Sequence, residues 1–83
     1  MSADKLRYDR VFSELFELQP ESLGEETKYQ KTNGWDSVGH MSLVATLEDE
    51  FAIELDVDDI IDFSSYRKGA EILKKYGLEI EVN

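Results

Sequence analysis

Apolar side chains recur every three to four residues near the start of the chain and predict an amphipathic helix over residues 4–18. We expect this helix to end at Gln19, because the residue before Pro20 avoids helical backbone angles. The apolar positions that define its buried stripe are Tyr8, Val11, Phe12, Leu15, Phe16 and Leu18.

A long connection of mixed polar character follows, over residues 20–36. Its large apolar residues are Leu23, Tyr29 and Trp35. Loops longer than about 12 to 15 residues in a compact domain are usually functional or disordered. Because Leu23 and Trp35 are suited to anchor the segment on a core, we predict an ordered loop with room for one helical turn.

A second helix is predicted over residues 37–51, with Asp36 or Ser37 as its N-cap. At about 100° per residue, its apolar side chains fall into two groups. The core group lies near about 190° from Val38 and consists of His40, Leu43, Val44, Leu47 and Phe51. The second group lies near about 330° and consists of Val38, Met41, Ala45 and Ala52.

The second apolar group has two interpretations. In one, the next helix or the long loop covers it, since apolar sides are commonly buried. In the other, it stays partly open as a docking patch with Glu48 and Asp49 at its charged rim. Small residues such as Ala45 have little need of burial, which favours the open patch.

A short third helix is predicted over residues 57–62, capped by Asp56 and burying Ile60 and Ile61. A fourth helix is predicted over residues 66–76, capped by Ser64 or Ser65, with Gly77 as a left-handed terminator.

The predicted fold class is therefore all-α, a four-helix bundle with three longer helices, one short third helix and a long first loop. We expect one domain over residues 1–83, with its core at about 4–77. Residues 78–83 alternate like a strand but lack a partner strand, so they form either a packed extended tail or a frayed end.

Charge narrows the classes of partner. The chain has 19 acidic and 9 basic residues and a formal net charge of -10. Nucleic acid and anionic membrane surfaces would be repelled, whereas basic protein surfaces would be attracted. There is no secretory leader pattern and no apolar run of about 18 residues, so we expect a monomeric cytoplasmic protein that does not insert into membranes.

Ser37 is the candidate residue for chemistry. It stands where the long loop meets a helix N-terminus, a position that exposes a hydroxyl and favours a phosphate on it. Taken alone, a serine here is more often a simple helix cap.

The residues that follow Ser37 change that balance. Asp36-Ser37-Val38 is followed by Leu43-Val44, by Leu47-Glu48-Asp49-Glu50-Phe51 and by Ile53 and Leu55. This register resembles the acyl carrier protein family, over about residues 6–76. The helix order, the long first loop and the acidic charge agree with the resemblance.

The resemblance implies that Ser37 bears 4'-phosphopantetheine, moved from coenzyme A by a separate phosphopantetheinyl transferase that uses magnesium on its own side. Asp36 would help to present Ser37. Val38, Met41 and Ala45 would face partner enzymes, with Glu48 and Asp49 at the acidic edge. The chain itself would not be an enzyme and would hold no metal. With no cysteine in the chain, the arm supplies the sulfur on which cargo rides as a thioester.

Several residues depart from the usual family pattern: Val38 replaces a leucine, Gly39 and Ser42 replace common acidic residues, and Trp35 precedes Asp36. Gly39 is also expected to weaken the first turn by about 1 kcal/mol relative to alanine. These departures leave the pathway open among acyl carriers of lipid or secondary-metabolite biosynthesis and aminoacyl, D-alanyl or peptidyl carriers.

Three other functions are weighed against a carrier. Ser37 and His40 could form a hydrolytic pair, but no oxyanion-hole sequence accompanies them and His40 falls on the core side. The acidic residues from Asp56 to Asp62 could bind calcium, but Ile61 and Arg67 stand where a calcium loop needs glycine and glutamate. A helical interaction module with an unmodified Ser37 is the third.

Overall fold

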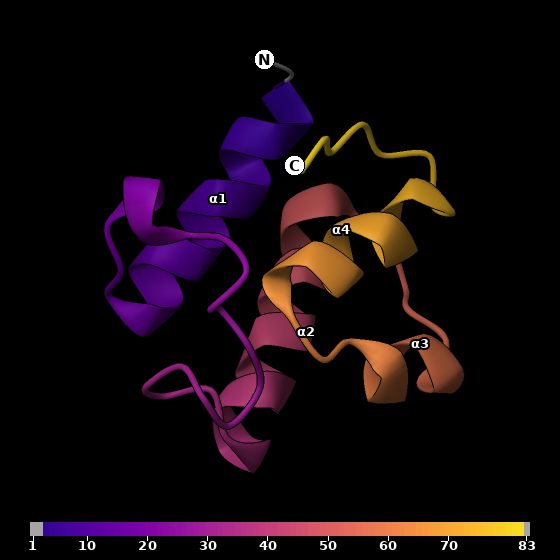
Figure 1. The fold of residues 1–83 in the computed structure, drawn as a ribbon. Coiled ribbons are helices and arrows are strands. Elements are labelled where there is room, and N and C mark those ends of the chain that lie inside the picture. The colour runs from indigo at the N-terminus through magenta and orange to yellow at the C-terminus, as the bar shows by residue number, and fades with distance from the viewer. Residues whose placement is uncertain (1–2, 83) are drawn as a thin grey trace.

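The computed structural model describes residues 3–82, and helices make up its framework (Figure 1). Within those residues no strand forms beyond an isolated bridge between Lys28 and Ser65. The all-α, four-helix prediction is confirmed. The helices are α1 (Ala3–Phe16), α2 (Ser37–Phe51), α3 (Val57–Asp62) and α4 (Tyr66–Lys74), with a short 3-10 turn, η1 (Pro20–Ser22), inside the first loop.

Helix α1 ends earlier than predicted, at Phe16, three residues before Gln19. Glu17 adopts a left-handed backbone with φ of 55°, and the Leu18 amide donates to the Ser13 carbonyl at 3.0 Å. This six-residue closure is a Schellman ending, which is usually made with glycine. The helix therefore stops through its own terminal hydrogen bond, and Pro20 instead opens η1.

Aromatic rings form the centre of the core, and Phe12 lies among them. Its ring centroid is 5.0 Å from Tyr8, 5.4 Å from Trp35, 5.3 Å from Tyr66 and 6.5 Å from Phe63. The residues at these five positions come from α1, the first loop, α4 and the segment after α3. One α1 side chain thus joins the first loop, the segment after α3 and α4 through ring contacts.

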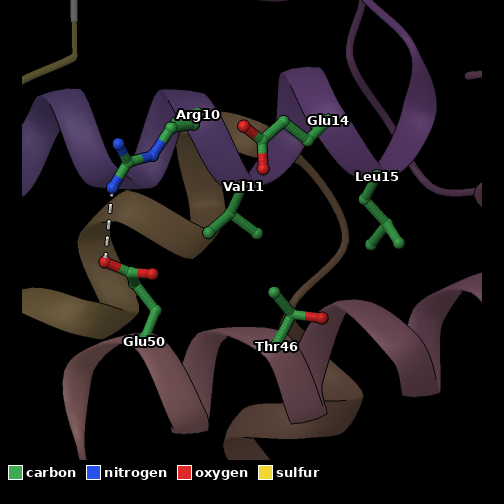
Figure 2. A pocket seen from close by; sticks show the side chains of 6 residues that line it. All are labelled: Arg10, Val11, Glu14, Leu15, Thr46 and Glu50. Carbon is green, nitrogen blue, oxygen red and sulfur yellow. Dashed lines mark ion pairs between the residues drawn. The ribbon is translucent and has the colours of Figure 1, made fainter.

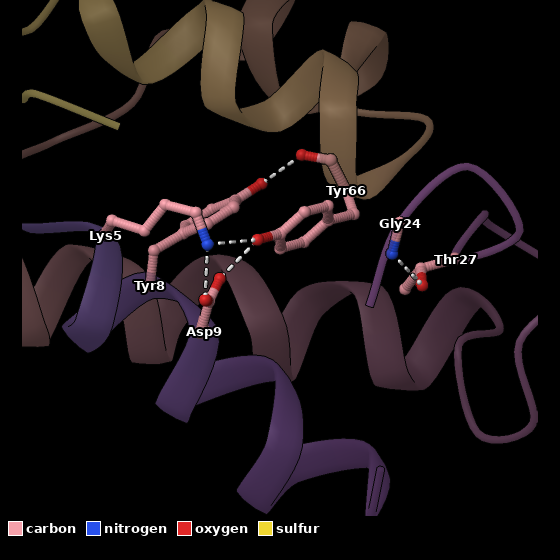
Figure 3. A network of polar contacts seen from close by, with 6 residues as sticks. All are labelled: Lys5, Tyr8, Asp9, Gly24, Thr27 and Tyr66. Atoms are coloured by element: carbon pink, nitrogen blue, oxygen red, sulfur yellow. Dashed lines mark hydrogen bonds and ion pairs between the residues drawn. The ribbon is translucent and has the colours of Figure 1, made fainter. Parts of the chain in front are cut away.

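Polar contacts also fix α1 to α4 (Figure 3). The Tyr8 hydroxyl donates to the Tyr66 carbonyl at 2.6 Å, and the Tyr66 hydroxyl donates to Asp9. Lys5 donates to the other Asp9 oxygen at 2.6 Å. Burial raises the pKa of Tyr8 well above its usual range, and burial with the Asp9 hydrogen bond raises the pKa of Tyr66. Both phenols therefore act as protonated donors.

The first loop is ordered, as predicted, because it is attached at several points. Trp35 is fully buried and Leu23 packs against the core. The Tyr29 amide donates to the Ser64 carbonyl at 3.0 Å, and the Tyr66 amide donates to the Thr27 carbonyl at 2.9 Å. These bonds hold the loop against the junction between α3 and α4.

Helix α2 buries one apolar side and exposes the other. Leu43, Val44, Leu47 and Phe51 lie in the core, as expected. Val38 and Met41 are 78% and 59% exposed, and both alanines of the second group are exposed too. Neither α3 nor the loop covers that second side.

Helix α3 departs from the expected burial. Ile60 is partly buried, but Ile61 is 72% exposed, so the prediction that both would be buried is wrong. The inward position belongs to Asp59, and a residue two places later points about 200° away around a helix. Asp56 occupies the N-cap, but its side chain makes no capping bond.

Helix α4 is capped by Ser65, whose hydroxyl accepts from the Lys68 amide at 2.9 Å. It ends at Lys74, two residues before the predicted Tyr76, and Gly77 takes the left-handed conformation that its position predicted. The tail then runs back toward the start of α1, where the Glu79 amide donates to Asp4 at 2.9 Å (Figure 1). Ile80 is fully buried, so the tail is packed and extended up to residue 82; residue 83 lies outside the described part.

Candidate functional site

The Ser37 hydroxyl is exposed at the first position of α2 and is not needed to cap the helix. Asp36 is the N-cap, because its Oδ1 accepts from the Gly39 amide at 2.9 Å. The His40 amide then donates to the Asp36 carbonyl at 2.7 Å. The hydroxyl of Ser37 is therefore available at a helix N-terminus, where backbone dipoles favour negative charge.

Gly39 fixes the approach of the loop to this helix. A Cβ at Gly39 would meet the Gly34 carbonyl oxygen at a separation that real side chains do not reach, and the Gly34 carbonyl carbon at 3.1 Å. The expectation that Gly39 simply weakens the first turn is therefore incomplete. The glycine lets the residues just before Ser37 pass close to α2.

Tyr29 is the contact of Ser37 that sequence reasoning missed. Its hydroxyl lies 3.2 Å from Ser37 Oγ, and either oxygen could donate. The two residues are eight positions apart and separated by irregular loop, so no periodicity relates them. The only signal in the sequence is that Tyr29 has a hydroxyl and stands among polar residues.

His40 joins three elements beneath this site. Trp35 Nε1, which has a proton and can only donate, lies 2.9 Å from His40 Nδ1, so Nδ1 accepts. The ring proton is then on Nε2, which donates to the Ile60 carbonyl at 2.8 Å. Both ring nitrogens are engaged away from Ser37, which argues against a Ser37–His40 hydrolytic pair.

A cavity of about 410 Å³ opens beside Ser37, between α2 and α3. Ser37 and Tyr29 supply hydroxyl groups to it, and the rest of its lining is mainly apolar. Its principal apolar side chains are Met41, Ile60, Ile61 and Phe63. The arrangement provides an exposed nucleophilic hydroxyl next to an apolar shelter.

Comparison with known families decides what this arrangement belongs to. A family model described as the phosphopantetheine attachment site matches residues 10–73, a span that includes Ser37. The chain belongs to the phosphopantetheine attachment site family. No curated protein sequence matches the chain.

As a member of this family, the protein is a phosphopantetheine carrier, and its covalent prosthetic group is 4'-phosphopantetheine. The geometry fits that group. Ser37 offers an exposed hydroxyl for a phosphodiester, Tyr29 offers a hydroxyl hydrogen-bond donor beside it, and the neighbouring cavity can take apolar atoms. Carrier function also implies contact with a phosphopantetheinyl transferase and with acyl-processing enzymes in general.

The residues expected on the carrier's partner face differ in exposure. Val38, Met41, Ala45 and Asp49 are exposed. Glu48 is partly buried, and its carboxylate accepts from the Leu55 amide at 2.9 Å, so it also stabilises the turn after α2. Beyond the expected set, α3 exposes Val57 and Ile61.

A second pocket lies between α1 and α2, and Ser37 is not part of its lining (Figure 2). It measures about 270 Å³ and contains Thr46, about two and a half turns along α2 from Ser37. Arg10 and Glu50 form an ion pair across it at 3.8 Å. The hydroxyl in its lining, that of Thr46, donates to the Ser42 carbonyl within α2 at 2.7 Å.

One acidic residue of α3, Asp59, has a structural role. Asp59 accepts from Lys75 and from the Tyr76 hydroxyl, each at 2.6 Å. Within residues 3–82 no group of three or more side chains is arranged to hold a metal ion. In the same span no helix is long and apolar enough to cross a membrane.

Proposed function

We propose that Ser37 is the residue to which the carrier's phosphopantetheine arm is attached. The observation that carries this proposal is that Asp36, not Ser37, caps α2, which leaves the Ser37 hydroxyl exposed and not engaged by the helix backbone. Asp36 supports the reaction by fixing the first turn through the Gly39 amide, and so holds Ser37 in position for the transferase.

In the attachment step, the Ser37 oxygen bonds to the phosphorus of coenzyme A that carries pantetheine. Adenosine 3',5'-bisphosphate leaves, and the hydroxyl proton passes to a base supplied by the transferase. Both ring nitrogens of His40 are hydrogen-bonded, to Trp35 and to the Ile60 carbonyl, so His40 does not serve as this base. Once attached, the arm supplies the terminal thiol that this cysteine-free chain lacks, and cargo is carried as a thioester.

We propose an acyl cargo rather than an aminoacyl or peptidyl one. The support is the apolar cavity beside Ser37, where Met41, Ile60 and Phe63 would shelter hydrocarbon. In this proposal the chain has no catalysis of its own, and residues 1–83 act as one carrier domain. Mass spectrometry of the protein purified with its native load tests the cargo: an amino-acid thioester would contradict the acyl assignment.

The exposed second side of α2 is proposed as the partner face. Val38, Met41 and Ala45 offer an apolar strip, and Asp49 offers a charge beside it. With a formal net charge of -10, the carrier would attract enzymes whose docking surfaces are basic around an apolar centre.

One experiment tests the attachment residue. The full chain is incubated with coenzyme A, magnesium and a broad-specificity phosphopantetheinyl transferase, and its intact mass is measured. We expect the mass of one phosphopantetheine on the natural sequence and none on Ser37→Ala. No addition to the natural sequence, or equal addition to Ser37→Ala, would contradict the proposal.

A further inference from the structure

Tyr29 is held so that its hydroxyl is directed at Ser37. Its backbone amide donates a hydrogen bond to the Ser64 carbonyl at 3.0 Å. Its ring packs edge-on against His40, with centroids 5.4 Å apart and planes at 67°. His40 is itself fixed by Trp35 and Ile60. The phenol oxygen therefore lies 3.2 Å from Ser37 Oγ on a supported side chain, rather than on a free surface residue.

Esterification of Ser37 would change this contact in a defined way. In the free protein either hydroxyl could donate to the other. An ester oxygen has no proton and is a weak acceptor, whereas the non-bridging phosphate oxygens next to it share a negative charge. The Tyr29 hydroxyl would then be the donor, and hydrogen bonds to charged acceptors are the stronger kind.

We propose that Tyr29 is a positioning residue for the prosthetic group: its hydroxyl binds the phosphodiester on Ser37 and turns the arm toward the cavity between α2 and α3. This inference rests on the proposed attachment at Ser37. Tyr29 and Ser37 both line the cavity, and the apolar Met41, Ile60 and Ile61 lie within the same lining. A donor on the cavity side of Ser37 favours the arm conformation that points inward.

The expected consequence is control over where the cargo lies. An arm directed into the cavity keeps its thioester near the protein, and an arm released from Tyr29 extends toward a partner enzyme. The phosphate contact shifts the balance between these two populations without any covalent change. Tyr29 would thus orient the arm, whereas the exposed side of α2 would bind the partner enzyme.

The hydroxyl can be separated experimentally from the ring. Tyr29→Phe keeps the packing on His40 and removes the donor. Tyr66→Phe is the matched control, because it removes a phenol hydroxyl that faces Asp9 and Lys5 instead of Ser37 (Figure 3). Each full-length variant is loaded with excess transferase, its single modification is confirmed by intact mass, and its fold is checked by circular dichroism.

Two NMR readouts then test the contact in the loaded proteins. We expect Tyr29→Phe to move the ³¹P resonance of the phosphodiester toward that of free phosphopantetheine diesters. We also expect it to reduce nuclear Overhauser effects from the pantetheine methyl groups to Met41 and Ile61 by about half or more, as the inward population falls. Tyr66→Phe should leave both signals as they are in the natural sequence.

The possible failures are distinguishable. If the natural sequence does not load, or if Ser37→Ala loads equally, the proposed attachment site is wrong and this inference falls with it. If loading at Ser37 succeeds but Tyr29→Phe leaves the ³¹P resonance and the Overhauser effects unchanged, the role of Tyr29 is overturned while the attachment stands. If Tyr29→Phe does not fold, cross-relaxation between the Tyr29 ring protons and phosphorus in the natural sequence decides: its presence supports the contact and its absence overturns it.

Discussion

Trp35 Nε1 donates a hydrogen bond to His40 Nδ1 across 2.9 Å, between the end of the first loop and the first turn of α2. Asp36 and Ser37 lie between these two residues in the sequence. Since His40 also donates to the Ile60 carbonyl of α3, one imidazole fixes the loop, α2 and α3 around Ser37.

Replacing His40 with leucine keeps most of the volume but leaves the buried Trp35 N–H without its acceptor. We expect the free energy of unfolding to fall by about 1–3 kcal/mol, the usual cost of an unsatisfied buried donor. Urea denaturation followed by circular dichroism measures it. Ser42→Ala, an exposed change in the same helix, should cost less than about 0.5 kcal/mol. Equal stability of the two variants would show that the imidazole bridge contributes nothing.

Gly39→Ala should reduce the rate of arm attachment, although alanine is the better helix former by about 1 kcal/mol. Its methyl group would collide with the Gly34 carbonyl and displace the loop that precedes Ser37. The transferase rate, followed by intact mass, is the measurement. Gly24→Ala is the control, since no atom lies within 4 Å of a Cβ there. Unchanged loading of Gly39→Ala would mean that the loop moves aside without disturbing Ser37.

Gly69→Ala should destabilise the core by about 1–3 kcal/mol through overpacking. A Cβ at this α4 position would lie within 3.0 Å of the Phe63 ring and of the Tyr8 hydroxyl. Thermal unfolding provides the comparison, with the exposed α4 change Glu71→Ala as the control. A variant as stable as the control would indicate that the Phe63 ring has room to rotate away.

Asp59 gives the protein a pH-dependent link between α3 and the end of α4. Hydrogen bonds from Lys75 first, and then from Tyr76, lower the pKa of Asp59 below its ordinary value of 3.8. A lowered folded-state pKa stabilises the fold above the unfolded-state pKa, and this stabilisation is lost as pH falls toward the folded-state value.

The natural sequence should therefore be more stable than Asp59→Asn at pH 7, where the Asp59 carboxylate is charged. This difference in unfolding free energy should decrease below about pH 4, because protonation of Asp59 removes the same charge that the substitution removes. Urea denaturation at stepped pH measures it, and the exposed Asp58→Asn is the control. A difference that stays constant down to pH 2 would contradict the assignment.

Met41→Glu should lower the kcat/KM of the transferase by about tenfold, if the exposed side of α2 is the partner face. Because Met41 is 59% exposed, the helical circular dichroism signal should be unchanged. Leu6→Glu introduces the same charge at an exposed apolar residue of α1 and should leave the rate nearly unaffected. Loss of helical structure in Met41→Glu would refute the prediction that this side chain is free to meet a partner.

Apolar periodicity was enough to predict α1, α2 and α4, because each presents a buried apolar stripe to one core. The short α3 was predicted from the Asp56 cap and two adjacent isoleucines, although the residue it buries is Asp59. Residue type predicted Trp35 as an anchor and Asp36 as one of two possible caps. The end of α1 escaped prediction, because Glu17 takes a left-handed backbone that glycine or asparagine would normally signal. Helix α2 ends at Phe51 as predicted, although Ala52 is also left-handed. Gly77, which does carry that signal, was predicted correctly.

The candidate site divides along similar lines. Ser37 was predicted as the attachment residue from the register of residues after it, which is a local property of the chain. The Tyr29 contact and the close approach of Gly34 to Gly39 depend on how the loop folds back. The conformation of an irregular loop produces no periodic pattern in the sequence from which such contacts could be predicted. Ile61 was misplaced because a helix of six residues is too short for its phase to be read from two adjacent isoleucines.

Tyr8 and Ile80 are both fully buried, yet both lie outside residues 10–73, the segment that carries the family's sequence signature. A fragment reduced to residues 10–73 would lack two core side chains, one from each flank. Vacated core volume of this kind costs several kcal/mol in other small proteins. The cooperative folding unit is therefore wider than the recognisable motif, and any chimera that transplants this carrier must take its flanks along.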